Sequence, residues 1–122
     1  MRTRRIARPA RRCAQARGRM NGTERAYAIR LEAMKASGDV IHYAFEAVKL
    51  RLADRTWYTP DFLVVTPDRI EFHEVKGHWE DDARVKWKVA AEQFSWAAFA
   101  ACRLVGGQWE IEWYGKEEPC RG

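Results

Sequence analysis

The chain has little that would stabilise it covalently or place it in a membrane. Its 122 residues include three cysteines, Cys13, Cys102 and Cys120, which are far apart and form no CxxC or Cys/His zinc pattern. We therefore expect reduced thiols in a cytoplasmic protein. No apolar stretch is long enough to cross a membrane, and the first residues lack the apolar segment of a secretory signal.

Acidic residues are absent from residues 1–19, which contain eight arginines. Removing these eight charges from the net charge of +5 leaves −3 on the remaining chain. We interpret residues 1–20 as a disordered basic arm. Three explanations stay open for it: a phosphate-binding arm, a transit peptide, or translation upstream of a start at Met20. At the other end, residues 115–122 are polar and read as a loose tail.

A first amphipathic helix is expected over residues 23–37. Its apolar stripe is Tyr27, Leu31 and Met34. Asn21 and Glu24 have the spacing of a capping box, and Gly38 is a suitable C-terminal stop. Glu24 has a second interpretation, because it lies one turn before Tyr27 on the inward stripe and there presents a carboxylate to the interior.

A second helix is expected over residues 82–101, capped by Asp81 or Asp82. Its inward stripe is Ala83, Trp87, Ala90, Phe94 and Ala97. Arg84, Lys88 and Glu92 form the opposite, solvated ridge.

Short runs of apolar and β-branched residues predict strands in the rest of the chain. The expected strands are residues 40–45 and 48–52, as one bent strand or two, then 57–65, 70–76, 103–105 and 109–114. Turns are expected at Asp54-Arg55 and Gly106-Gly107. Helix, meander, helix and two further strands predict a single α/β domain, residues 21–114, with a mixed central sheet flanked by helices.

Charged residues occupy an unusual place in the strand at residues 70–76. Alternation of side chains places two apolar and two charged residues on one face: Ile70, Phe72, Glu74 and Lys76. Glu71, His73 and Val75 share the other face. Charges in a core-facing row are costly unless they are paired or bind a metal. Because they come at the strand end, before Gly77, we expect the face to open into a cleft there.

Asp61 begins the preceding apolar strand. A turn at residues 66–69 reverses the chain, so the start of the first strand lies beside the end of the second, and Asp61 should approach Glu74. Two carboxylates about 4 Å apart repel by roughly 4 kcal/mol at an effective dielectric near 20. A divalent cation removes this conflict, and carboxylate oxygens suit Mg²⁺ or Mn²⁺.

These residues resemble the PD-(D/E)xK nuclease superfamily, which has the restriction-endonuclease-like fold. Pro60-Asp61 matches the first motif element and Glu74-Val75-Lys76 the second, within residues 20–114. The stretches at 59–62, 72–77 and 81–84 resemble, more narrowly, a small nuclease-like family of phages and prophages. The resemblance implies an αβββαβ core and a location in the cytoplasm of a bacterial host or phage-infected cell.

The resemblance also implies a catalytic set. Asp61, Glu74 and the Val75 carbonyl would ligate Mg²⁺ or Mn²⁺, and Glu24 would bind that ion or a second one. Lys76 would orient or deprotonate the attacking water, or stabilise the transition state. Glu32, on the polar side of the first helix, is the fallback for Glu24.

Four further residues are candidates for DNA contacts: Trp79, Arg84, Lys86 and Lys88. The expected activity is endonucleolytic cleavage of DNA, selective for branched or junction structures as in Holliday-junction resolvases, by a monomer or a homodimer. A non-catalytic nucleic-acid-binding module of the same fold is the alternative. A structural domain in which Glu74 and Lys76 form only a surface ion pair is the third interpretation.

Overall fold

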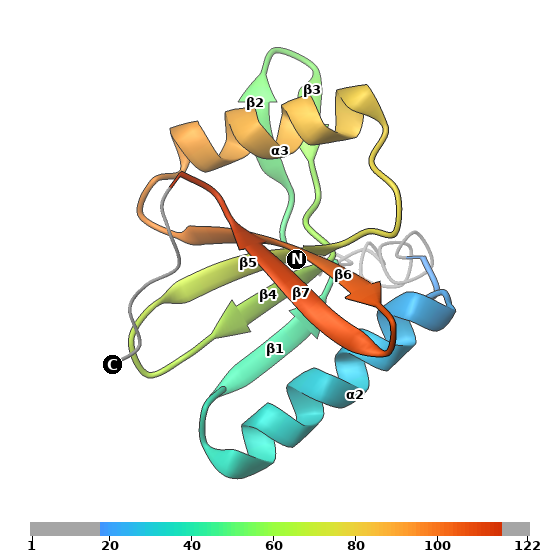
Figure 1. The fold of residues 1–122 in the computed structure, drawn as a ribbon. Coiled ribbons are helices and arrows are strands. Elements are labelled where there is room, and N and C mark those ends of the chain that lie inside the picture. Colours follow the sequence, from blue (N-terminus) through green and yellow to red (C-terminus); the bar gives the residue numbers. More distant parts are fainter. Residues whose placement is uncertain (1–17, 116–122) are drawn as a thin grey trace, which may run out of the picture.

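The computed structural model describes residues 18–115, which form a mixed α/β fold around one central sheet (Figure 1). In chain order, the elements are α2 (Gly22–Ser37), β1 (His42–Phe45), β2 (Leu50–Ala53), β3 (Thr56–Tyr58), β4 (Phe62–Val65), β5 (Ile70–Val75), α3 (Asp81–Gln93), β6 (Ala98–Val105) and β7 (Gln108–Trp113). Most of the expected arm (1–20) and tail (115–122) lies outside the described residues. No helix in the described part is long and apolar enough to span a bilayer.

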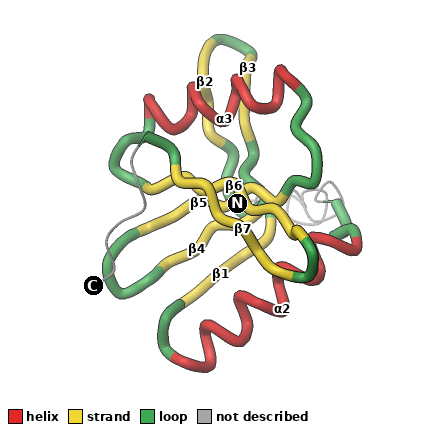
Figure 2. Tube along the Cα trace, in the orientation of Figure 1, coloured by secondary structure: helices red, strands yellow, loops and turns green. Residues whose placement is uncertain are grey.

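Five strands form the central sheet in the order β1-β4-β5-β6-β7. β5 and β6 pair in parallel and the other neighbours are antiparallel, because α3 supplies the crossover between β5 and β6. β2 and β3 form a separate two-stranded sheet, here called the ribbon. Figure 2 shows the ribbon beside α3, away from the strands of the central sheet.

The two faces of the sheet are covered by different elements. Tyr27 and Leu31 of α2 are buried on one face, in a cluster that includes Val75. Trp87 of α3 and the inward side of the ribbon cover the other face, in a cluster that includes Phe72. The alternation expected in β5 is therefore confirmed, and Glu74 shares the α3 face with Phe72.

The first helix agrees with its local sequence signals. Asn21 Oδ1 accepts from the Glu24 backbone N–H at 2.8 Å, and the Asn21 N–H donates to Glu24 Oε1 at 2.9 Å. This is the expected capping box. Gly38 ends the helix with φ of 92°, a left-handed conformation that glycine adopts without a Cβ clash.

The expected second helix, residues 82–101, begins within one residue of the prediction, but its C-terminal end and its N-cap are wrong. α3 ends at Gln93, and residues 98–101 belong to β6, where they pair in parallel with β5. A short buried apolar run fits either a helix or a central strand, and here pairing with β5 decides the outcome. The N-cap is Glu80, not Asp81 or Asp82, and its side chain makes no capping hydrogen bond.

The expected strand over residues 57–65 is also wrong. It is divided into β3 and β4 by Thr59-Pro60-Asp61. Proline has no N–H for a sheet ladder, so the chain leaves the ribbon there and enters the central sheet. The run at 40–52 forms two strands, which is one of the two expected alternatives, and these strands belong to different sheets.

Candidate active site

The pairing of β4 with β5 brings Asp61 beside Glu74. Phe62 is opposite His73, so the next positions outward are Asp61 and Glu74. The Val75 backbone N–H donates to Asp61 Oδ2 at 2.8 Å. The two acids are only 7% and 6% exposed, so two carboxylates lie together in the protein interior.

Lys76 completes the arrangement at the end of β5. Its Nζ lies 3.3 Å from Glu74 Oε2, and its side chain is about one-third exposed. The ammonium group is thus held by Glu74 but still reaches the solvent. The structure brings Asp61, Glu74 and Lys76 to one place.

Tyr58 is a further member of the site that sequence reasoning missed. Its hydroxyl donates to Glu74 Oε1 at 2.5 Å, across from the contact with Lys76. The tyrosine is buried, and burial raises its pKa, so the hydroxyl stays protonated and remains a donor. The sequence feature that could have identified Tyr58 as a site residue is its position three residues before Asp61, at the end of a strand.

The electrostatics of the two acids reflect their burial. Burial and then the charge of Glu74 raise the pKa of Asp61 to about 8, although the Val75 N–H acts in the opposite direction. Burial also raises the pKa of Glu74, against the hydrogen bond from Tyr58 and the charge of Lys76. In the absence of a cation, the two acids therefore favour a state in which one of them is protonated over a state in which both are ionised.

Partial burial alone would lower the pKa of Lys76, but the carboxylates of Glu74 and Asp61 raise it above its usual value. Lys76 is therefore an ammonium group at neutral pH. This charge state favours a role in binding or stabilising negative charge over a role as general base.

The donor set fits a hard divalent cation. Within residues 18–115, no group of three or more His, Cys, Asp or Glu side chains comes together to hold a metal ion. Two ionised acids beside one ammonium leave one excess negative charge in a buried place, which a divalent cation would offset. Their oxygens match the preference of Mg²⁺, and the Val75 carbonyl stays a predicted ligand.

Glu24 is held by its capping box, so one carboxylate oxygen is already used by the Asn21 N–H. Its charge nevertheless raises the pKa of Asp61 and of Lys76, so it acts on the site electrostatically. Glu32, the fallback residue, is exposed and accepts a hydrogen bond from Tyr43 at 2.6 Å. That contact directs it toward β1.

The expected DNA contacts, on α3 and just before it, lie in different environments. Arg84 donates to Glu112 at 2.6 Å and lies over the rings of Trp79 and Trp87, so its guanidinium is already engaged. Trp79 packs partly against the α3-side core. Lys86 and Lys88 are exposed. These two lysines are the members of the set that are most accessible to a phosphate.

A polar network on the α2 face was not foreseen. Burial favours the neutral form of Glu71, but hydrogen bonds from His73 and Arg69 lower its pKa below the usual value. The Glu71 carboxylate thus accepts from His73 Nε2 at 2.8 Å, which leaves His73 Nδ1 to accept from Tyr27 at 2.6 Å. Cys102 donates in turn to Tyr27, and burial raises the pKa of this thiol to about 12. The network is internally satisfied and has a structural role.

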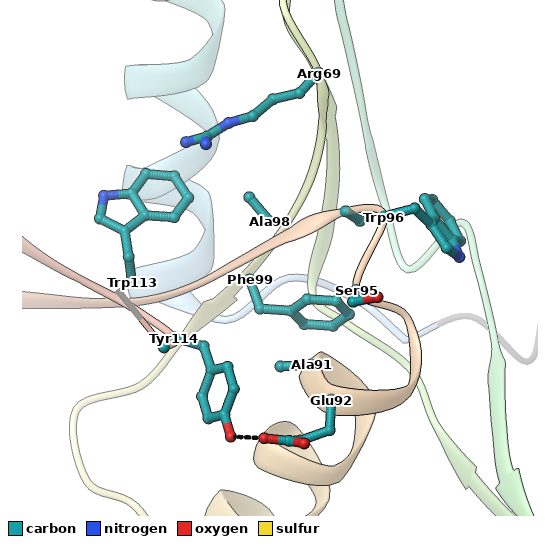
Figure 3. Close-up of a pocket in the computed structure, with 11 residues that line it drawn as sticks. Arg69, Ala91, Glu92, Ser95, Trp96, Ala98, Phe99, Trp113 and Tyr114 are labelled. Carbon is teal, nitrogen blue, oxygen red and sulfur yellow. Dashed lines mark hydrogen bonds between the residues drawn. The ribbon is translucent and has the colours of Figure 1, made fainter. Parts of the chain in front are cut away.

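A cavity of about 590 Å³ lies where α3 ends and β6 begins. Figure 3 shows Arg69 and Trp113 on one side of it and Tyr114 directed toward Glu92, with which it forms a hydrogen bond. Asp61, Glu74 and Lys76 do not line this cavity. It is therefore separate from the candidate active site.

Comparisons of the chain with protein-family models, with curated proteins and with solved structures each found no match.

Proposed function

We propose that this protein is a DNA endonuclease that uses Mg²⁺ or Mn²⁺ and has a restriction-endonuclease-like core. The observation that supports this proposal most is the burial of Asp61 and Glu74 side by side, with the Lys76 ammonium 3.3 Å from Glu74. A domain with only a structural role gains nothing from two neighbouring acids whose pKa values are both raised by burial. A module that only binds nucleic acid would have basic side chains, not carboxylates, on the surface that contacts the phosphates.

Asp61 and Glu74, with the Val75 carbonyl, would hold the cation. When bound, the ion supplies an activated water and offsets charge on the phosphate. Val75 N–H fixes one oxygen of Asp61, and Tyr58 fixes one oxygen of Glu74. These contacts hold both carboxylates in position before substrate arrives, which is the preorganisation that catalysis needs.

Lys76 acts on the phosphate. Because its pKa is raised, it remains cationic and donates hydrogen bonds to a phosphate oxygen as negative charge accumulates there. Glu74 keeps the ammonium at the strand end, where about one-third of its side chain is exposed. Lys76 therefore stabilises charge in this mechanism, and Glu24 tunes the site from the first turn of α2.

The proposed substrate class rests on the resemblance to the PD-(D/E)xK superfamily. Residues 18–115 form a central sheet, its two covering layers and no second module that would read a base sequence. We therefore propose that the enzyme selects DNA structure, such as flaps or four-way junctions, and works as a monomer or a homodimer.

The test is a cleavage panel of duplex, single-stranded, flap and four-way-junction DNA, with Mg²⁺ and with EDTA. Cleavage should require the metal and be abolished in Asp61→Ala, Glu74→Ala and Lys76→Ala, with unchanged far-UV circular dichroism. Glu110→Gln, an exposed acid paired with Arg103, is the control and should cleave normally. Full activity in purified Glu74→Ala contradicts the proposal. Binding without cleavage of any substrate supports the non-catalytic alternative.

A further inference from the structure

The ribbon has an outer face that the proposed active site does not use. Leu50 and Leu52 of β2 and Tyr58 of β3 point inward and pack in the α3-side core. Arg51 and Trp57 point outward and are paired across the two strands. Figure 1 shows the ribbon extending past α3, so its tip stands clear of the helix.

This outer face combines positive charge with one exposed aromatic ring. Lys49, Arg51 and Arg55 are exposed, and Asp54 is the single acid among residues 49–58. Trp57 is 42% exposed, and Lys49 Nζ lies 5.3 Å from the centre of its ring. Basic side chains around a stacking ring are the combination with which proteins bind single-stranded nucleic acid.

The ribbon is joined directly to the active site. Tyr58 donates to Glu74, and its neighbour Trp57 points to the opposite side of the same strand. Trp57 and Asp61 are four positions apart in the chain, so their Cα atoms are at most about 14 Å apart. A strand of DNA advances about 3.4 Å per nucleotide along a duplex, so roughly four such steps cover the greatest backbone distance between Trp57 and Asp61.

We propose that the outer face of the ribbon binds an unpaired strand of the DNA substrate. Trp57 stacks on a base, and Lys49, Arg51 and Arg55 contact the neighbouring phosphates. The strand is unpaired because bases inside a duplex are already stacked on each other and offer no free face to the ring. This inference rests on the proposed function for its choice of DNA, and it adds that preferred substrates have unpaired nucleotides next to the cleavage site.

Binding is measured separately from cleavage. The full chain is titrated in EDTA into a fluorescein-labelled DNA strand of about 16 nucleotides, the upper site size of single-strand-binding domains. Trp57→Ala should weaken binding by about 5- to 150-fold, the range for loss of one stacked base. Trp96→Ala is the matched control, because Trp96 is also exposed, at 62%, but lies beyond α3. It should bind like the unmodified chain.

A second pair of variants tests the phosphate contacts. Arg51 and Arg103 are both exposed arginines in loose ion pairs, of 3.9 Å with Asp54 and 3.7 Å with Glu110. Arg51→Ala should reduce the slope of log affinity against log salt by about 0.7, one phosphate contact of a single strand. Arg103→Ala should leave the slope unchanged. Because Arg51 is outside the core, Arg51→Ala should remain folded. It therefore still tests the proposal if Trp57→Ala fails to fold.

The inference is overturned if the unmodified chain does not bind the strand, or binds duplex DNA of equal length more tightly. It is also overturned if Arg51→Ala and Arg103→Ala behave alike. Strand binding that depends on Trp57 and Arg51, together with no cleavage in Mg²⁺, would leave the ribbon site intact and remove the nuclease. The two proposals therefore fail separately.

Discussion

At the scale of single residues, the site depends on two acids whose burial opposes their ionisation. Asp61 is oriented by the Val75 N–H, and Glu74 by Tyr58 and Lys76. Each donor stabilises the charged form, but burial still raises both pKa values. The acids are therefore prepared for a cation that would take the place of the proton that burial favours on one of them.

Tyr58→Phe should weaken Mg²⁺ binding and cleavage by about 10- to 100-fold, the usual effect of losing a residue that orients a metal ligand. The reason is that Glu74 Oε1 loses its buried hydrogen-bond donor. Calorimetry and cleavage rates measure the effect. Tyr43→Phe is the matched control, because Tyr43 donates to Glu32 at an exposed position. Equal behaviour of the two variants would contradict the role given to Tyr58.

The stability of the metal-free protein should fall as pH rises from about 4 to about 8. The pKa of Asp61 is about 8 in the folded protein against an ordinary value of 3.8, so in this window the folded state keeps a proton that the unfolded chain has released. The stabilisation is therefore complete below the pKa of Asp61 in the unfolded chain. It is lost progressively as the pH rises to the pKa of Asp61 in the folded protein. Urea unfolding in EDTA measures it. Asp61→Asn should flatten the dependence, and an equally steep curve for this variant would count against the buried acid pair.

At the scale of elements, the N-terminus of α2 combines a structural and an electrostatic role. Asn21→Ala removes one half of the capping box and should cost about 0.5–2 kcal/mol of unfolding free energy. Glu24→Gln keeps a side chain that can complete the box and removes only the charge. It should retain stability in urea. A loss as large as that of Asn21→Ala would show that the charge itself stabilises the helix.

Elements with local signals were predictable, and those set by distant contacts were not. α2 was located to within one residue, because Asn21, Glu24 and Gly38 mark its ends. The end of α3 was missed, since residues 98–101 are apolar and only pairing with β5 makes them a strand. The predicted strand over residues 57–65 joined β3 of the ribbon to β4 of the central sheet. Their separation at Pro60 depends on tertiary packing, which the local sequence does not reveal.

The same distinction applies to the site. The proximity of Asp61 and Glu74 followed from one tight hairpin. The sequence places Tyr58 near Asp61 but does not predict its contact with Glu74, because Tyr58 reaches Glu74 from a different sheet. The network of Tyr27 with His73 joins residues 46 positions apart and needed the packing of α2 on β5.

At the scale of the whole molecule, charge is divided between an arginine-rich arm and a mildly acidic remainder. Residues 1–19 have eight of the 22 basic residues and no acid. Deleting them should weaken DNA binding and flatten its salt dependence, because fewer counterions are released. Binding measured at several salt concentrations tests this. An unchanged salt slope would make the arm irrelevant to DNA.

The most direct test of the account is a calorimetric Mg²⁺ titration of the full chain and of Glu74→Gln, with Glu110→Gln as the control. We predict that the unmodified chain and Glu110→Gln bind Mg²⁺ alike, and that Glu74→Gln, correctly folded by circular dichroism, loses this binding. Unchanged Mg²⁺ binding in Glu74→Gln, or no binding by the unmodified chain, would contradict a cation site at Asp61 and Glu74.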